Sequence, residues 1–308
     1  MKPAAVGIDV GGTKCLGIAI DHDGRVLDEA RVPTPTSDAD ELIAALASIA
    51  RELHAPGAVG IGVPGLVNRD GVLLKAPNVT AGLMLPLRER LERESGLRVV
   101  VDNDNTVACL AEWRFGAGRG SDDLVLVGIG TGIGGGYVAG GALQRGHHGF
   151  AGEIGHMIVK PDGLQCPCGQ RGCWERYASG SGLGHLARNA ARAGKLAGVL
   201  ATVGNVASIR GEHITAAAEQ HDPEALAVVE TFAGWVALGL VNLTNLFDPE
   251  RFVLSGGISA DADLFLPPIR AAFERTLFAS GLRPRPELRF ADLGPMAGGI
   301  GAALLTMS

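Results

Sequence analysis

The chain contains one pattern twice: an apolar strand, a glycine turn that includes threonine, and a second strand. The first copy is AAVGIDVGGTKCLGIAI at residues 4–20, and the second is LVLVGIGTGIGGGYVAG at residues 124–140. Val6-Gly7-Ile8 in the first copy matches Val127-Gly128-Ile129 in the second. Because a repeat of this kind predicts two related structural units, we expect two α/β domains that face each other across a cleft.

Alternating helices and strands follow the first glycine turn, a pattern typical of a mixed sheet in an α/β domain. We expect a smaller α/β domain at 1–115 plus a C-terminal helix at about 296–308, and a larger α/β domain at 116–295. Ligands of such sheets bind beyond the carboxyl ends of the strands. The further expected elements are strands at 25–32, 58–65, 97–105, 251–257 and 286–294, and helices at 38–53, 85–96, 106–115, within 181–247, and at 260–280.

The composition favours a soluble, cytoplasmic protein whose partners are small molecules. A net charge of −6 without a run of basic residues lacks the basic footprint of nucleic-acid binding. The N-terminus does not resemble a secretory signal, because Asp9 and several glycines interrupt its apolar residues. The most apolar stretch, 232–247, contains Asn242, Thr244 and Asn245, so we expect it to be too polar and too short to span a membrane.

Three of the five cysteines lie in the short stretch CPCGQRGCWE. In a reducing compartment, ligation of a metal is a better interpretation of such a cluster than disulfide bonding. Cys166, Cys168 and Cys173 supply three ligands, and His156 is the nearest histidine. A Cys3His zinc site has no open position, so it would be structural and would organise the polar loop that presents Glu175. The alternative is three cysteines that bind nothing.

The second glycine turn contains a G-x-G-x-x-G pattern at Gly130, Gly132 and Gly135, with Glu153 further along the chain. A dinucleotide-binding fold needs a helix after these glycines, whereas YVAGGALQ predicts a second strand. We expect instead that both glycine turns present backbone N–H groups to phosphate oxygens. Asp9, at the first turn, would then hold the water shell of Mg²⁺. The alternative is a pair of ordinary hairpins.

The stretch DNDN places two carboxylates and two amides at the end of a predicted strand. Asp102 and Asp104 share one face while the strand continues, and Asn103 or Asn105 can cap the next helix. One interpretation is a general base with groups that bind hydroxyls, as sugars require. The alternative is a cluster that only caps the helix.

Together these motifs resemble the ROK family (repressors, open reading frames, kinases) of the sugar kinase/actin/Hsp70-like fold. DVGGTK and GIGTGIGGG are similar to its two phosphate motifs, and LSGGI is similar to its adenosine-side turn. AGEIGH and CPCGQRGCWERYASG carry the most specific resemblance, the latter to the C-x-C-G-x-x-G-C-x-E signature of the family's bacterial glucokinases. The resemblance implies two actin-like (ribonuclease H-like) α/β domains and ATP-dependent phosphorylation of glucose at the 6-hydroxyl.

The resemblance also implies roles for individual residues. Asp104 would be the general base that removes the proton of the sugar 6-hydroxyl. The residues implied to bind the sugar are Gly65, Asn78, Asn103, Asp104, Glu153, His156 and Glu175. Those implied to hold MgATP are Asp9, Gly11, Gly12, Thr13, Lys14, Thr131, Gly132, Gly256 and Gly257. Those implied to hold structural zinc are His156, Cys166, Cys168 and Cys173.

Several alternatives remain open from the sequence. The substrate could be another hexose, such as N-acetylglucosamine, N-acetylmannosamine, mannose or allose, and inorganic polyphosphate could replace ATP. The family's transcription regulators carry an N-terminal helix-turn-helix, for which the first predicted strand, beginning at about residue 4, leaves no room. A non-catalytic sugar-binding protein is a further alternative. The resemblance also implies a homodimer or homotetramer.

Overall fold

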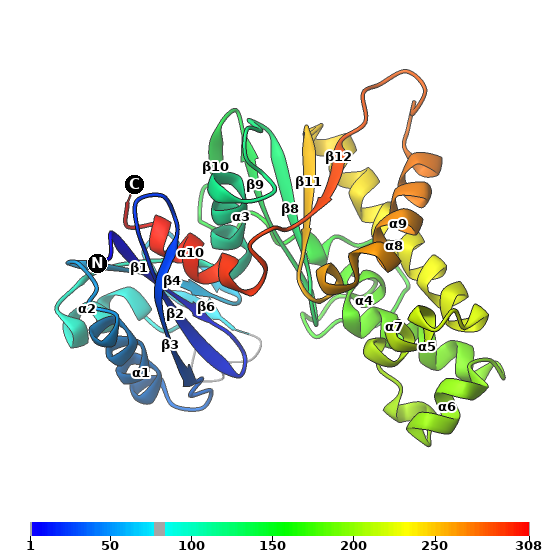
Figure 1. Ribbon diagram of the computed structural model, residues 1–308, viewed down its shortest axis with the longest axis horizontal. Coiled ribbons are helices and arrows are strands. Elements are labelled where there is room, and N and C mark those ends of the chain that lie inside the picture. Colours follow the sequence, from blue (N-terminus) through cyan, green and yellow to red (C-terminus); the bar gives the residue numbers. More distant parts are fainter. Residues whose placement is uncertain (1, 77–83, 308) are drawn as a thin grey trace. The chain divides into compact units, whose positions relative to one another are not determined.

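The computed structural model describes residues 2–76 and 84–307, which form two compact units (Figure 1). The predicted domain division, with its boundaries at about 115 and 296, stays a prediction of domain organisation. The segments of the first unit are Met1–Leu126, Gly136–Gly152 and Ala291–Ser308, and those of the second are Val127–Gly135 and Glu153–Phe290.

Two five-stranded sheets share one strand order, which confirms the predicted internal repeat. The first sheet has the order β3-β2-β1-β4-β7, and the second has the order β10-β9-β8-β11-β12. In the first sheet, β1 pairs antiparallel with β2 and parallel with β4, so the sheet is mixed, as predicted. The strands of the two sheets are β1 (Ala5–Val10), β2 (Lys14–Ile20), β3 (Val26–Pro33), β4 (Ala58–Val63), β7 (Arg98–Asn103), β8 (Leu124–Ile129), β9 (Ile133–Ala139), β10 (Ala142–Gln144), β11 (Arg251–Ser255) and β12 (Glu287–Phe290).

The C-terminal helix α10 (Ala297–Leu304) packs directly on strands β1 and β4 of the first sheet (Figure 1). Two strand glycines permit this approach. A Cβ at Gly7 would lie 2.0 Å from the backbone nitrogen of Ala303, and one at Gly60 would lie 1.7 Å from the carbonyl oxygen of Ala302. Since no larger residue fits, these glycines bring the end of the chain against β1, the strand that contains Asp9.

Helices α1 (Ala39–Glu52) and α2 (Leu87–Ser95) add their apolar faces to the core of the first unit. The side chain of Asp38 caps α1 by accepting hydrogen bonds from two backbone N–H groups. Gly96 ends α2 in the left-handed conformation, with φ of 70°, as a C-cap glycine does. Both predicted helices, at 38–53 and 85–96, are therefore confirmed, with limits that differ by one or two residues from the prediction. The first unit also contains α3 (Asp104–Phe115) and the short strands β5 (Leu66–Val67) and β6 (Leu73–Lys75).

The second unit is largely helical, as predicted for the region before Asp248. Its longest helix, α8, runs from Pro223 to Phe247 and contains the apolar stretch 232–247. By length and composition α8 could span a membrane, yet 56% of its most apolar window is buried, and it packs against α7 and α9. That burial is typical of a core helix. The other helices of this unit are α4 (Glu175–Ala178), α5 (Gly180–Arg192), α6 (Ala197–Val203), α7 (Gly211–Glu219) and α9 (Ala262–Thr276).

Candidate functional site

The first glycine turn follows β1, and Asp9 is the next-to-last residue of that strand. The turn is closed by a hydrogen bond from Gly11 N to Lys14 O, at 2.9 Å. Gly298 of α10 lies against Asp9, since a Cβ on Gly298 would be 2.6 Å from Asp9 Cγ. Burial, followed by the charge of Asp104, raises the pKa of Asp9 to about 7, while Lys14 lowers it. Asp9 therefore lies in a poorly solvated position that favours a cation close to its carboxylate.

The junction between β7 and α3 separates the two carboxylates that the sequence places on one face. Asp102 is buried, and its carboxylate is engaged in an ion pair with Arg145. Asp104 instead starts α3, where its Oδ1 accepts hydrogen bonds from Asn105 N at 2.8 Å and Asn105 Nδ2 at 3.0 Å. Burial raises the pKa of Asp104, against the lowering by hydrogen bonds from Asn105 and Asn103. Of the two, Asp104 is the carboxylate available for proton transfer.

Asn103 is the N-cap of α3, as the sequence allowed. Its Oδ1 accepts hydrogen bonds from the backbone N–H groups of Asn105 and Thr106, at 2.9 and 3.1 Å. Its Nδ2 donates to Gly65 O at 3.2 Å, so the end of β7 is tied to the turn after β4. Gly65 has φ of 104°, which favours glycine. Asn78, the remaining predicted sugar-binding residue of this region, lies outside the described residues.

The predicted metal ligands come together in the second unit. One ligand atom from each of His156, Cys166, Cys168 and Cys173 lies within 4.8 Å of all the others. The sulfur atoms of Cys168 and Cys173 are 3.6 Å apart, and Cys166 Sγ lies 3.9 Å from Nδ1 of His156. Tetrahedral zinc, with bonds of about 2.0–2.3 Å, holds its ligand atoms roughly 3.3–3.8 Å apart. The donor set and its spacing therefore fit zinc.

The imidazole of His156 has different neighbours on its two nitrogens. Nδ1 faces the thiols, whereas Nε2 lies 3.8 Å from Oε2 of Glu153. A carboxylate on the second nitrogen is a common way to orient a metal-bound histidine. The arrangement leaves His156 able to contact both a metal and a neighbouring polar group.

Helix α4 begins at Glu175, two residues after the last cysteine, and connects the cysteine loop with the second glycine turn. Oε2 of Glu175 accepts a hydrogen bond from Ile133 N at 3.1 Å. Gly132 leaves room for this contact, because a Cβ there would lie 2.3 Å from the same carboxylate oxygen and would displace it. Trp174 is fully buried, and its Nε1 donates to Trp235 O at 2.7 Å. Glu175 is thus held in a defined position by groups within the second unit.

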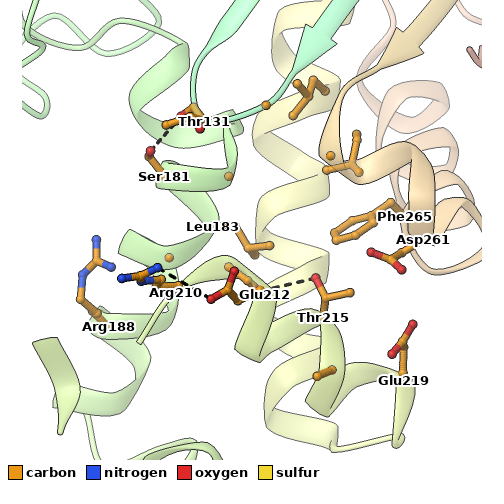
Figure 2. Close-up of a pocket in the computed structure, with 18 of the residues that line it drawn as sticks. Thr131, Ser181, Leu183, Arg188, Arg210, Glu212, Thr215, Glu219, Asp261 and Phe265 are labelled. Carbon is orange, nitrogen blue, oxygen red and sulfur yellow. Dashed lines mark hydrogen bonds and ion pairs between the residues drawn. The ribbon is translucent and has the colours of Figure 1, made fainter. Parts of the chain in front are cut away.

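A cavity of about 1070 Å³ opens beside the second glycine turn (Figure 2). Thr131 and Gly257, both predicted nucleotide-binding residues, line it, and the Ser181 hydroxyl donates to Thr131 O at 2.8 Å. Gly256 packs against Ile129 instead, where a Cβ would lie 2.4 Å from the carbonyl oxygen. The cavity has the size of a ligand site and is contained in the second unit. The predicted residues Asp9, Gly11, Gly12, Thr13 and Lys14 belong to the first unit.

Sequence reasoning missed the cavity walls that helices contribute. Gly180, Gly184 and Arg188 of α5 line the cavity, as do residues of α7 and Phe265 of α9 (Figure 2). The signal was present as a spacing of four residues, which places side chains on one face of a helix. Small and charged residues on an otherwise amphipathic helix would have drawn attention to this face.

Comparison with known proteins agrees with this architecture. The ROK family model matches residues 5–308. A glucokinase of Streptomyces coelicolor is 42% identical over 97% of this chain and 96% of the relative, and one of Halalkalibacterium halodurans is 34% identical over 97% and 94%. A crystal structure of a ROK family glucokinase from Streptomyces griseus, in complex with glucose and AMPPNP, has a TM-score of 0.87 at 42% identity and covers 98% of each chain. The chain belongs to the ROK family and has the actin-like α/β fold of that family's sugar kinases.

Proposed function

We propose that this chain is an ATP-dependent hexose kinase that phosphorylates the 6-hydroxyl of glucose. The observation that carries the proposal is the carboxylate of Asp104, which starts α3 at the carboxyl end of β7 and has a raised pKa. Similarity to curated glucokinases over nearly the whole chain supports the choice of glucose. The proposed enzyme is soluble and cytoplasmic and works as a homodimer or homotetramer.

Asp104 acts as the general base. A carboxylate with a raised pKa is a stronger base than an ordinary aspartate, so it accepts the proton of the sugar hydroxyl as the new oxygen–phosphorus bond forms. Asn105 holds Oδ1 through two hydrogen bonds and fixes the direction of the carboxylate. Phosphoryl transfer depends mainly on positioning and charge neutralisation. The fixed orientation of the Asp104 carboxylate is therefore the main contribution of these hydrogen bonds to catalysis.

Amide and carboxylate groups are proposed to bind the hydroxyls of the sugar. Asn103 uses one N–H of its Nδ2 for Gly65 and keeps the second for a hydroxyl. Glu153 and His156 lie beside one another, and Glu175 is oriented by Ile133. The residues proposed to contact the sugar are Gly65, Asn78, Asn103, Asp104, Glu153, His156 and Glu175.

The phosphoryl donor is ATP with Mg²⁺, and the donor cavity is the one beside the second glycine turn. Asp9 would hold the water shell of Mg²⁺, which neutralises phosphate charge when bound. The burial that raises the pKa of Asp9 also makes a nearby cation favourable. The residues proposed to bind the donor are Asp9, Gly11, Gly12, Thr13, Lys14, Thr131, Gly132, Gly256 and Gly257.

His156, Cys166, Cys168 and Cys173 would hold one structural zinc ion. A closed set of four ligands supplies a cross-link that orders the loop before α4. We expect one zinc per chain by metal analysis, and a loss of thermal stability when a strong chelator removes it. Full activity in a preparation that contains no zinc would contradict this role.

The test of the proposed function is ADP release with MgATP across glucose, mannose, fructose, N-acetylglucosamine and N-acetylmannosamine. The expected result is a kcat/KM for glucose at least about tenfold above that for each other sugar. Preference for another hexose would overturn the substrate while keeping the reaction. No ADP release with any sugar would overturn the kinase itself.

Asp104→Asn tests the base in the same assay. We expect glucose binding within about tenfold of the wild type and a kcat lower by at least roughly a hundredfold, because the amide cannot accept the proton. Near-normal turnover of this variant would exclude Asp104 as the base.

A further inference from the structure

Arg176 is a charged wall residue of the donor cavity that none of the predicted sites includes. It follows Glu175 on α4 and lines the cavity together with Gly130, Thr131 and Ser181. Its Nε is buried and has no hydrogen-bond partner. Within residues 2–76 and 84–307, its guanidinium forms no hydrogen bond or ion pair. A cation therefore stands at the cavity wall without a protein anion.

A buried guanidinium nitrogen without a partner is costly. Arginine stays protonated at all relevant pH values, so it cannot relieve this cost by losing its charge. Leaving a buried donor of a charged group unpaired destabilises a fold by more than leaving a neutral one. An anion that binds in the cavity beside this side chain would neutralise the charge of the guanidinium.

Further positively charged side chains lie near Arg176. Arg188 of α5 lines the same cavity, and its Nη1 donates to Ile209 O at 2.7 Å. Burial lowers the pKa of His185, and the charges of Arg188, Arg176 and Arg192 lower it further. The guanidinium of Arg176 thus contributes to a positive potential along α5, which favours an anionic ligand.

Two of the acidic residues that line the cavity, Asp261 and Glu219, lie away from the second glycine turn. Figure 2 shows Asp261 and Glu219 across the cavity from Thr131 and Ser181. The third acidic residue, Glu212, lies beside Arg210, with 4.0 Å between the charged atoms. The anionic part of a ligand is therefore expected away from Asp261 and Glu219. Arg176, which also lines the cavity, follows Glu175, whose carboxylate accepts from Ile133 N at the second glycine turn.

The backbone of Arg176 is held in place before any ligand binds. Its N–H donates to Cys173 O at 3.0 Å. The two residues before it are anchored as well, Trp174 through Trp235 and Glu175 through Ile133. Such anchoring limits the entropy lost when a charged side chain engages a ligand.

We propose that Arg176 binds the phosphate chain of the phosphoryl donor. The assignment rests on the proposed kinase function and adds to the glycine turns a side chain that neutralises donor charge. A planar guanidinium donates two parallel hydrogen bonds to phosphate oxygens, which an ammonium group cannot do in the same way. Arg176 thereby makes the cavity selective for a ligand with a phosphate chain over the corresponding nucleoside.

Calorimetric binding of AMPPNP and of adenosine to the full-length protein tests this role. Arg176→Gln is expected to weaken AMPPNP binding by about tenfold or more, because charge-assisted hydrogen bonds are lost. Adenosine binding should stay within about twofold, and Arg176→Lys should restore part of the AMPPNP affinity. The matched control is Arg192→Gln, which removes a similar charge near His185 outside the cavity wall and should leave both affinities within about twofold.

The outcomes separate this inference from the proposed function. Wild-type AMPPNP affinity in Arg176→Gln, or an equal loss for adenosine, overturns the role of Arg176 while leaving the kinase intact. A wild-type protein that binds no AMPPNP and phosphorylates no sugar with ATP or with inorganic polyphosphate overturns both. Turnover with polyphosphate alone identifies the other source of a phosphate chain, and a tenfold higher KM for it in Arg176→Gln then supports the assignment. If Arg176→Gln does not fold, the same measurement on Arg176→Lys tests the role of Arg176. A several-fold loss of AMPPNP affinity with unchanged adenosine affinity supports the role, and unchanged affinity for both ligands overturns it.

Discussion

Replacing Asp9 with asparagine is expected to stabilise the folded protein at neutral and alkaline pH. The pKa of Asp9 is raised from its ordinary value of 3.8 to about 7, first by burial and then by Asp104, and Lys14 opposes the change. A carboxyl with a higher pKa in the folded state contributes stability that is fully present below about pH 4. That contribution is lost as the pH rises to about 7.

The size of the effect follows from this pKa difference. A difference of about three, at roughly 1.4 kcal/mol per unit, corresponds to about 4 kcal/mol at pH 8. At pH 5 Asp9 is still protonated in the folded state, and the corresponding figure is below about 2 kcal/mol. Asparagine has nearly the same shape and no charge, so the variant should gain up to these amounts of unfolding free energy.

Urea unfolding of wild type and variant at pH 5 and pH 8, without nucleotide or magnesium, measures the difference. Asp28→Asn is the control, since it makes the same chemical change at an exposed position of β3 in the same sheet. The control should show no comparable gain at either pH. Equal stability of Asp9→Asn and wild type at pH 8, or a larger gain at pH 5 than at pH 8, would refute the reasoning.

Three further predictions concern stability. Glu112→Ala should lower the unfolding free energy by about 3–5 kcal/mol, because the buried carboxylate of Glu112 accepts hydrogen bonds from three backbone N–H groups, at 2.8–3.1 Å. The control Glu112→Gln keeps one acceptor oxygen and should lose less unfolding free energy. Equal losses in the two variants would contradict this account. Gly239→Ala should lower the unfolding free energy, measured by chemical denaturation, by about 1–3 kcal/mol, since the new Cβ would lie 2.0 Å from Trp174. The control Gly234→Ala lies in the same helix, and its Cβ would meet nothing within 4 Å. This control should stabilise the protein by up to about 1 kcal/mol. Removal of zinc should increase the rate of proteolysis of the loop before α4 while leaving the first unit protected, and uniform cleavage of both units would argue against a local role.

Much of the fold was predictable because its signals are local. Asp38 caps α1, and Gly96 ends α2, as the residue types at those positions predict. A strand, β9, follows the second glycine turn, so the exclusion of a dinucleotide fold from the pattern after Gly135 is confirmed. Each of these inferences depends on the conformational preference of a few neighbouring residues, which changes little with the rest of the molecule.

The candidate site was predictable in part. The spacing of the cysteines predicted that Cys166, Cys168 and Cys173 would gather with His156, and the four ligand atoms lie together. The cavity walls from α5, α7 and α9 were not foreseen, nor was Arg176, although it stands within a recognised motif. Their roles depend on which helix faces meet, and that is decided by packing over long separations in sequence.

By itself, the sequence determined the two strand-turn-strand units, the approximate limits of α1 and α2, and the residue types available for chemistry, because these depend on local preference and spacing. Only the tertiary structure decided between Asp102 and Asp104, which a strand pattern treats alike. Asp102 forms an ion pair with Arg145, which is distant from it in the sequence, whereas Asp104 starts a helix and has a raised pKa. Burial and long-range partners set the charge state of a carboxyl group, and both exist only once the chain has folded.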